Sequence, residues 1–327
     1  MIRRPPRSTP LYSSAASDVY KRQVQDAKFV RMDARSALQL DIFEHSRDVM
    51  LRNDLAQAVL QADAAAACLA RDALAAEFPL DPALACAPTL IAALEPAIEQ
   101  ALPTAEAASA AQLALDQTVA IAARRLLGAD QAAPWLALRW RQLARRAAAL
   151  PYLVEQAEAH AAALWLRAGA WQEVADAAAN IESWRCIPTP LAWMVQARWH
   201  LAGLDAAWPL LAELAWLAPQ RFEPLARSLP DPVLHKLLRR FGTAFVGDGA
   251  SDDLAWFPAW VLTDEPRLAG PLGLAEPSRQ TEPEQAMQLM LALLRLERQG
   301  RQREVIEHRR RLQGLHAGLF ACYMKPR

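Results

Sequence analysis

The sequence predicts an all-α protein, an α-solenoid of stacked antiparallel helix pairs. Ala and Leu dominate the composition, while the residues that favour β-strands are sparse. Gly is rare at 11 residues, and the 23 Pro residues fall mainly between apolar stretches, where helices end. Helix-sized segments also recur at a constant interval in the middle of the chain, which is typical of repeat architectures.

The first 31 residues differ in character from the rest. Back-translation of residues 1–23 gives strings similar to the flow-cell adapter and transposon end used in sequencing libraries, so we interpret this segment as adapter-derived. A natural basic tail rich in Ser and Pro is the alternative. Residues 24–31 are either coding sequence or leader, and Met32 is the expected start. We expect residues 1–31 to be disordered.

The charge balance shifts once these residues are set aside. The whole chain has a net charge of zero, and residues 1–31 carry +5 of it, which leaves −5 on residues 32–327. Nucleic-acid binding needs clustered positive charge. The acidic body therefore gives no reason to expect direct nucleic-acid binding.

Composition and motifs exclude several classes of protein. No apolar run approaches the roughly 18 residues of a membrane span. The six His residues form no HExxH motif, and phosphate loops and nucleophile elbows are absent, so we expect no cofactor, no metal and no enzyme. The four cysteines are far apart, which favours reduced thiols in a cytoplasmic protein: Cys68, Cys86, Cys186 and Cys322.

Helical periodicity and Pro positions predict the order of the elements. The predicted helices lie near 47–61, 64–78, 88–101, 105–128, 132–148, 152–168, 171–182, 189–202, 205–217, 220–228, 231–241, 252–262, 283–299 and 301–319.

These helices group into segments along the chain. Residues 32–45 are a flexible lead, and 46–241 form the helical-repeat domain. Residues 242–282 are a loose connection rich in Pro and Gly. Residues 283–327 form a C-terminal helix pair packed on the solenoid, with one buried face predicted from helical spacing: Met287, Met290, Leu291 and Leu294.

The clearest internal repeat has a period of 34 residues. Ala163, Trp165, Ala168 and Gly169 recur as Ala197, Trp199, Ala202 and Gly203, and Ala178 recurs as Ala212. The period and the small residue followed by Gly resemble the tetratricopeptide family over residues 155–220, and more weakly over 47–80 and 283–319. The family's Tyr position is not matched. The resemblance implies helix pairs that stack and offer a concave surface to other proteins.

A short peptide motif lies in the lead. Gln39-Leu40-Asp41-Ile42-Phe43 resembles the pentapeptide by which bacterial polymerases and repair proteins dock on the sliding clamp, with Ile42 in place of Leu. The resemblance implies that Gln39 hydrogen-bonds at a pocket rim and that Leu40 and Phe43 fill apolar pockets. Alternatively, the apolar residues fold back and cap the first helix pair.

Tryptophan is confined to the middle of the chain. All 11 Trp residues lie between Trp135 and Trp260. They either fill the core between Ala-rich helices or line a peptide-binding groove. The residues proposed for such a groove are Trp165, Trp171, Trp193 and Trp199.

The C-terminal stretch 295–327 is basic, with a net charge of +6. It leaves contact with DNA phosphates or an acidic partner open. The alternative is the solvated face of a terminal helix whose Val305, Leu312 and Leu319 point inward. The cations are Arg295, Arg298, Arg301, Arg303, Arg309, Arg310, Arg311, Lys325 and Arg327.

Three functions follow from these features. The first is a non-enzymatic scaffold for protein–protein interaction, using its concave face. The second is a replication or repair accessory factor that docks on the sliding clamp through residues 39–43. The third is an enzyme whose site is assembled from residues distant in sequence.

Overall fold

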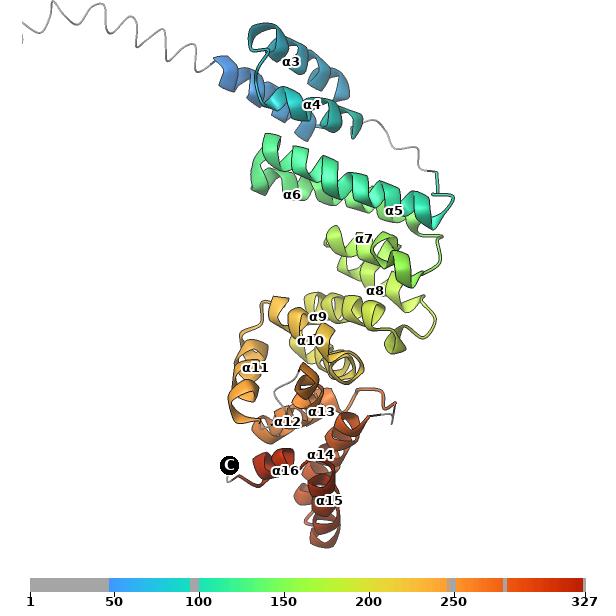
Figure 1. Cartoon of the computed structure of the whole chain (residues 1–327), viewed down its shortest axis with the longest axis vertical. Coiled ribbons are helices and arrows are strands. Elements are labelled where there is room, and N and C mark those ends of the chain that lie inside the picture. The colour runs from blue at the N-terminus through green and yellow to red at the C-terminus, as the bar shows by residue number, and fades with distance from the viewer. Residues whose placement is uncertain (1–46, 95–99, 246, 248–250, 279–280, 326–327) are drawn as a thin grey trace, which may run out of the picture. The chain divides into compact units, whose positions relative to one another are not determined.

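The computed structural model describes residues 47–94, 100–245, 247, 251–278 and 281–325. Within these ranges every regular element is a helix and there is no strand (Figure 1). The prediction of an all-α protein is confirmed. The predicted lead and leader segments, residues 1–45, lie outside the described residues.

Contacts divide the chain into two compact units. The first comprises Met1–Glu95 with Arg125–Leu127, and the second comprises Pro96–Arg124 with Gly128–Arg327. The described part of the first unit holds a helix over 47–60, then α3 (Ala64–Glu77) and α4 (Ala83–Ala92). Its fully buried side chains include those of Leu55, Val59, Leu74 and Leu90.

The second unit begins with a helical hairpin. It is built from α5 (Ala105–Ala114), the π-helical turn η1 (Leu115–Val119) and α6 (Ala120–Ala147), except for Arg125–Leu127 of α6, which belong to the first unit. Gly128 breaks α6 with φ 75° and ψ 168°, so that one helix ends at residue 127 and another begins at residue 129. The Leu102 amide donates to the Arg146 carbonyl at 2.9 Å, which places the end of α6 beside the residues that precede α5.

The middle of the second unit carries the sequence repeat. Its elements are η2 (Val154–Ala159), α7 (Ala161–Arg167), α8 (Trp171–Ala179), η3 (Trp184–Cys186), α9 (Pro188–Leu217), α10 (Pro219–Ser228) and α11 (Pro232–Ala244). Gly203 breaks α9 with φ 78° and ψ −173°, so α9 is two helices joined by a tight turn. Helix α8 packs on α7 and α9, and α10 packs on α9.

The C-terminal part of the second unit is also helical. Its elements are η4 (Ser251–Trp256), α12 (Phe257–Asp264), η5 (Pro266–Leu268), α13 (Ala269–Leu272), α14 (Glu282–Arg298), α15 (Gln302–Leu315) and α16 (Ala317–Met324). Three helices, not the predicted pair, therefore occupy residues 283–325, because His316 caps the N-terminus of α16.

Prolines and polar caps set many helix starts. Pro188, Pro219 and Pro232 stand at the beginnings of α9, α10 and α11, where the missing N–H would be unsatisfied anyway. The Asp231 carboxylate accepts from the amides of Val233 and Leu234 at 2.9 and 3.0 Å. These signals explain why the predicted starts in this region are correct to within a residue or two.

One continuous core spans residues 162–323 of the second unit. Phe257 of α12 is fully buried and contacts the rings of Phe222, Phe241 and Trp260. The core therefore continues past residue 241, where the repeat domain is predicted to end. The described residues of 251–275 are packed core rather than a loose connection, because their large apolar side chains outweigh the Pro and Gly between them.

Three predicted helices have wrong boundaries. The helix predicted over 88–101 spans Ala83–Ala92, since the Asp81 carboxylate caps the Ala83 amide at 2.8 Å and Pro88 interrupts only one backbone bond. The helix predicted over 152–168 is split at His160, which caps α7. Pro134 lies inside α6 and does not begin it, because the break is at Gly128.

Candidate functional site

A groove of about 680 Å³ lies at the start of the repeated region. The turn after α6 forms one wall, with Pro151 and Tyr152. His160 and Trp165 come from the cap and body of α7, and the remaining wall is the face of α8 with the residues that follow it. The lining residues of α8 and beyond are Glu173, Asp176, Ala177, Asn180, Ile181, Glu182 and Ile187.

His160 is held rigidly in this groove. Its Nδ1 accepts a hydrogen bond from the Ala162 amide at 3.2 Å, which caps α7. Its ring stacks on Trp193 with centroids 5.9 Å apart and planes 3° from parallel. Burial lowers the pKa of His160 to about 4, so the ring is neutral at pH 7.

Tyr152 contributes both an aromatic face and a free hydroxyl. Its ring meets Trp193 and His160 edge-on, with centroids 6.0 and 5.7 Å away. Its hydroxyl oxygen is buried and forms no hydrogen bond within the described part of the chain. A buried polar atom without a partner is costly unless a ligand supplies one.

The rim of the groove is acidic. Glu173 and Asp176 lie one turn apart on α8, and Glu182 follows the helix. All three are exposed, and no Lys or Arg lines the groove. Asp176 accepts a hydrogen bond from Gln172 at 2.9 Å, but none of the three carboxylates forms an ion pair among the described residues.

The four tryptophans predicted to line a groove have different positions. Trp165 lines this groove, and Trp193 supports its wall through His160 and Tyr152. Trp171 and Trp199 both contact the ring of His200, at centroid distances of 3.5 and 4.7 Å. The Trp199 indole also donates to Asp231 at 3.5 Å, which links α9 to the cap of α11.

The predicted docking pentapeptide, Gln39 to Phe43, lies outside the described residues. The groove residues that the sequence did not reveal are Tyr152, His160 and the three carboxylates. A His directly before an apolar helix could have indicated a cap. The carboxylates gave no signal, because acidic residues on a helix are ordinary surface.

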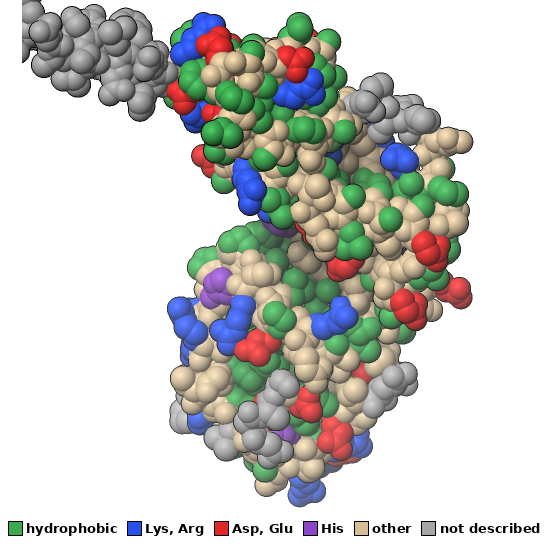
Figure 2. Space-filling model, turned by 45° about the horizontal axis from the view of Figure 1, so that its top comes forward, with side chains coloured by type: hydrophobic (Ala, Val, Ile, Leu, Met, Phe, Trp, Pro, Cys, Tyr) green, Lys and Arg blue, Asp and Glu red, His purple; other side chains and the backbone are tan. Residues whose placement is uncertain are grey.

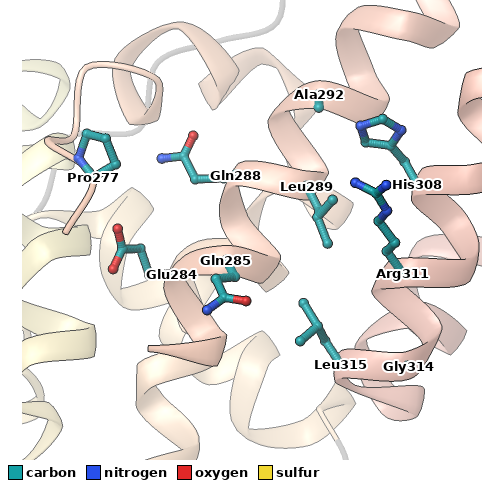
Figure 3. A pocket seen from close by; sticks show the side chains of 10 residues that line it. All are labelled: Pro277, Glu284, Gln285, Gln288, Leu289, Ala292, His308, Arg311, Gly314 and Leu315. Carbon is teal, nitrogen blue, oxygen red and sulfur yellow. The ribbon is translucent and has the colours of Figure 1, made fainter. Parts of the chain in front are cut away.

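A second cavity, of about 810 Å³, lies between α14 and α15. Figure 3 shows His308 and Arg311 of α15 facing Leu289 and Ala292 of α14. Its His308 and Arg311 side chains already have partners within the protein. The His308 Nδ1–H donates to the Glu304 carbonyl at 2.9 Å, and Arg311 pairs with Glu307 at 2.6 Å.

The basic C-terminal stretch is partly neutralised. Each of its three Glu residues pairs with an Arg of the same stretch: Arg301 with Glu304, Arg309 with Glu297 and Arg311 with Glu307. Val305, Leu312 and Leu319 are buried, as the surface-helix interpretation predicted. Figure 2 shows acidic and basic side chains interspersed over the visible face of the molecule.

A partly buried ion pair lies in the middle of the second unit. Glu213 of α9 is 4% exposed and pairs with Arg185 at 2.7 Å. It also accepts from the Glu276 amide at 2.9 Å, which joins α9 to the segment before α14. Burial raises the pKa of Glu213 to about 7, although Arg185 and the amide oppose this shift.

Within the described ranges, no group of three or more His, Cys, Asp or Glu side chains is arranged to hold a metal ion. None of the described helices is both long and apolar enough to cross a membrane. The four cysteines are free. Comparisons with protein-family models, with curated proteins and with solved structures gave no match to this chain.

Proposed function

We propose that the chain is a tetratricopeptide-like helical-repeat scaffold that binds another protein and has no catalytic role. The observation that carries this proposal is the groove beside α7 and α8. It has aromatic walls and three carboxylates that form no ion pair within the described part of the chain. Such a site offers recognition groups, and no nucleophile lies beside a general base in its lining.

The repeat supports a scaffold of stacked helix pairs. Ala163 and its counterpart Ala197 are both buried, as are Ala178 and Ala212. Small residues at these positions let neighbouring helices approach closely. Both units of the repeat turn at a glycine with positive φ, 66° at Gly169 and 78° at Gly203. Stacking of such pairs creates an extended surface for peptides.

Selection of random dodecapeptides displayed on phage, with the full chain as target, tests this function. We expect peptides whose affinity, measured by isothermal titration calorimetry, falls roughly tenfold or more on Trp165→Ala. Leu138→Ala is the matched control, since Leu138 is an exposed apolar residue of α6 that does not line the groove. Peptides that bind both variants equally, or no selected peptide at all, would contradict the proposal.

A second candidate function rests on the pentapeptide Gln39–Phe43. Its resemblance to clamp-docking peptides favours a replication or repair accessory factor whose partner is the bacterial sliding clamp. Titration of a fluorescent peptide covering residues 36–48 with a clamp, followed by anisotropy, tests it. Saturable binding that is lost on Leu40→Ala with Phe43→Ala would support this role, and equal binding of the two peptides would exclude it.

A further inference from the structure

We propose that the groove beside α7 and α8 binds an arginine side chain on an extended segment of the partner protein. This inference rests on the proposed function and gives the partner its chemistry. It is supported by the charge of the rim and by the aromatic walls.

The charge of the groove selects a cation. Glu173, Asp176 and Glu182 place three carboxylates around it, and the lining contains no Lys or Arg. Asp176 accepts from the uncharged Gln172, and none of the three forms an ion pair within the described part of the chain, so their negative charge remains available to a ligand. His160 adds no opposing charge at pH 7, since burial keeps its ring neutral. A cationic group is therefore favoured over a neutral or anionic one.

The aromatic walls suit a planar cation. Elsewhere in this protein, guanidinium groups lie over indole rings: Arg139 over Trp135 at 4.7 Å, Arg167 over Trp140 at 5.1 Å and Arg185 over Trp184 at 5.0 Å. Trp165 and Tyr152 line the groove, and among the described residues no such cation lies over either ring. A ligand guanidinium can complete the same contact there.

The shape of the cation favours arginine over lysine. A guanidinium is planar and has five N–H donors in a rigid fork, so its face can lie against the Trp165 indole while its edge donates to the rim carboxylates. A lysine ammonium is a compact point charge and cannot make the same stacked contact. The groove volume of about 680 Å³ exceeds that of one side chain, so neighbouring residues of an extended segment also fit.

The test uses N-acetyl-arginine amide as the probe and the full chain labelled with ¹⁵N at its Trp indoles. Comparison with the spectrum of Trp165→Phe assigns the Trp165 indole signal. We expect this signal to shift saturably with the arginine probe and more weakly with N-acetyl-lysine amide. The citrulline analogue, which has the same shape but no charge, should bind at least roughly tenfold more weakly.

A charge-neutralising variant and a matched control distinguish the loss of groove charge from a loss of folded structure. Glu173→Gln with Asp176→Asn should weaken arginine binding roughly tenfold, because both carboxylates are exposed on α8 and their neutralisation leaves the core intact. Asp205→Asn is the matched control, since Asp205 is exposed on α9 and does not line the groove. Far-UV circular dichroism should be unchanged in both proteins.

The outcomes distinguish the two proposals. Equal binding of citrulline and arginine, or tighter binding of N-acetyl-aspartate amide, overturns the arginine assignment. If phage-selected peptides then still require Trp165, the scaffold function survives without it. Self-association of the chain that disappears in the Glu173→Gln and Asp176→Asn variant would show that a second copy of the chain occupies the groove. That result would overturn the proposal that a different partner protein binds there.

Discussion

A partly buried histidine and a buried glutamate make opposite contributions to the pH dependence of stability. The pKa of His160 is about 4 in the folded protein, below its ordinary value of 6.5. Between these pH values the unfolded chain binds more protons, so stability rises with pH. The pKa of Glu213 is about 7 in the folded protein, above its ordinary value of 4.5. Between these pH values the folded chain binds more protons, so stability falls as pH rises.

The two effects should nearly cancel in the unaltered protein over the interval that they share. Each shift corresponds to about 3 kcal/mol in full, at 1.36 kcal/mol per pKa unit. His160→Asn keeps a side chain that can cap α7 but removes the imidazole, whose titration makes stability rise with pH. Only the effect of Glu213 then remains, so the free energy of unfolding should fall as pH increases from 4.5 to 7. Urea unfolding at several pH values, followed by circular dichroism, measures this slope.

Glu213→Gln should give the opposite slope. Gln can still accept a hydrogen bond from the Glu276 amide but cannot titrate. Only His160 then makes stability depend on pH in this range, and its effect is an increase with pH. The free energy of unfolding should then increase between pH 4 and 6.5. If the free energy of unfolding did not change with pH in either variant, neither group would be as strongly desolvated as its position indicates.

At the scale of the element, positive-φ turns determine where helix pairs bend. Gly169 closes α7 with a Schellman motif, in which the Ala170 amide donates to the Trp165 carbonyl at 3.0 Å and the Gly169 amide donates to the Leu166 carbonyl at 3.1 Å. The helix over 47–60 ends with the same pattern, but Ala62 stands at the left-handed position with φ 57°. A side chain in that conformation costs about 1–2 kcal/mol.

Substitutions at these turns should therefore change stability in opposite directions. Ala62→Gly should stabilise the protein by about 1 kcal/mol, and Gly169→Ala should destabilise it by a similar amount. Gly203→Ala should cost more, about 1–3 kcal/mol, because φ 78° with ψ −173° is accessible essentially to Gly alone. No atom lies within 4 Å of a Cβ added at Gly169 or Gly203, so the cost is conformational.

Gly242 of α11 provides the control for these turns. It is exposed, its φ is not positive, and no atom lies near an added Cβ. Gly242→Ala should stabilise the protein by about 0.5–1 kcal/mol through helix propensity. Chemical denaturation of the four variants measures all four values. Destabilisation by Gly242→Ala would show that backbone conformation does not explain the series.

Local signals allowed most helices to be predicted. Proline at the first helical position predicted the starts of α9 and α10, and a small residue before Gly predicted both turns of the repeat. These signals depend only on residues within about one helical turn of each other. Pro88 and Pro134 were misleading, because a Pro inside a helix loses one bond and tertiary packing can tolerate it. The groove was only partly predictable. Trp165 was identified, whereas Tyr152 and His160 acquire their roles through contacts with Trp193.

At the scale of the whole molecule, core packing divides the chain differently from the sequence pattern. The predicted repeat domain 46–241 crosses both compact units, and the second unit extends from the α5 hairpin to the C-terminal helices. Periodicity shows which face of a helix is apolar but not which other helix covers it. Phe257 illustrates this limit, because it lies in a stretch rich in Pro and Gly and yet is a fully buried core residue.

The two units should respond separately to the loss of a core side chain. Leu74→Ala in α3 removes a fully buried leucine of the first unit, and Phe257→Ala in α12 removes a fully buried ring of the second. Each should cost about 2–5 kcal/mol. If each unit is its own cooperative structure, hydrogen exchange measured by mass spectrometry should accelerate over 47–94 in the first variant, and over the helices from α7 to α16 in the second.

Leu69→Ala, at an exposed position of α3, is the control and should leave exchange unchanged. Faster exchange in α9 caused by Leu74→Ala would show instead that the units unfold as one, because a local cavity accelerates exchange only within the structure that opens with it.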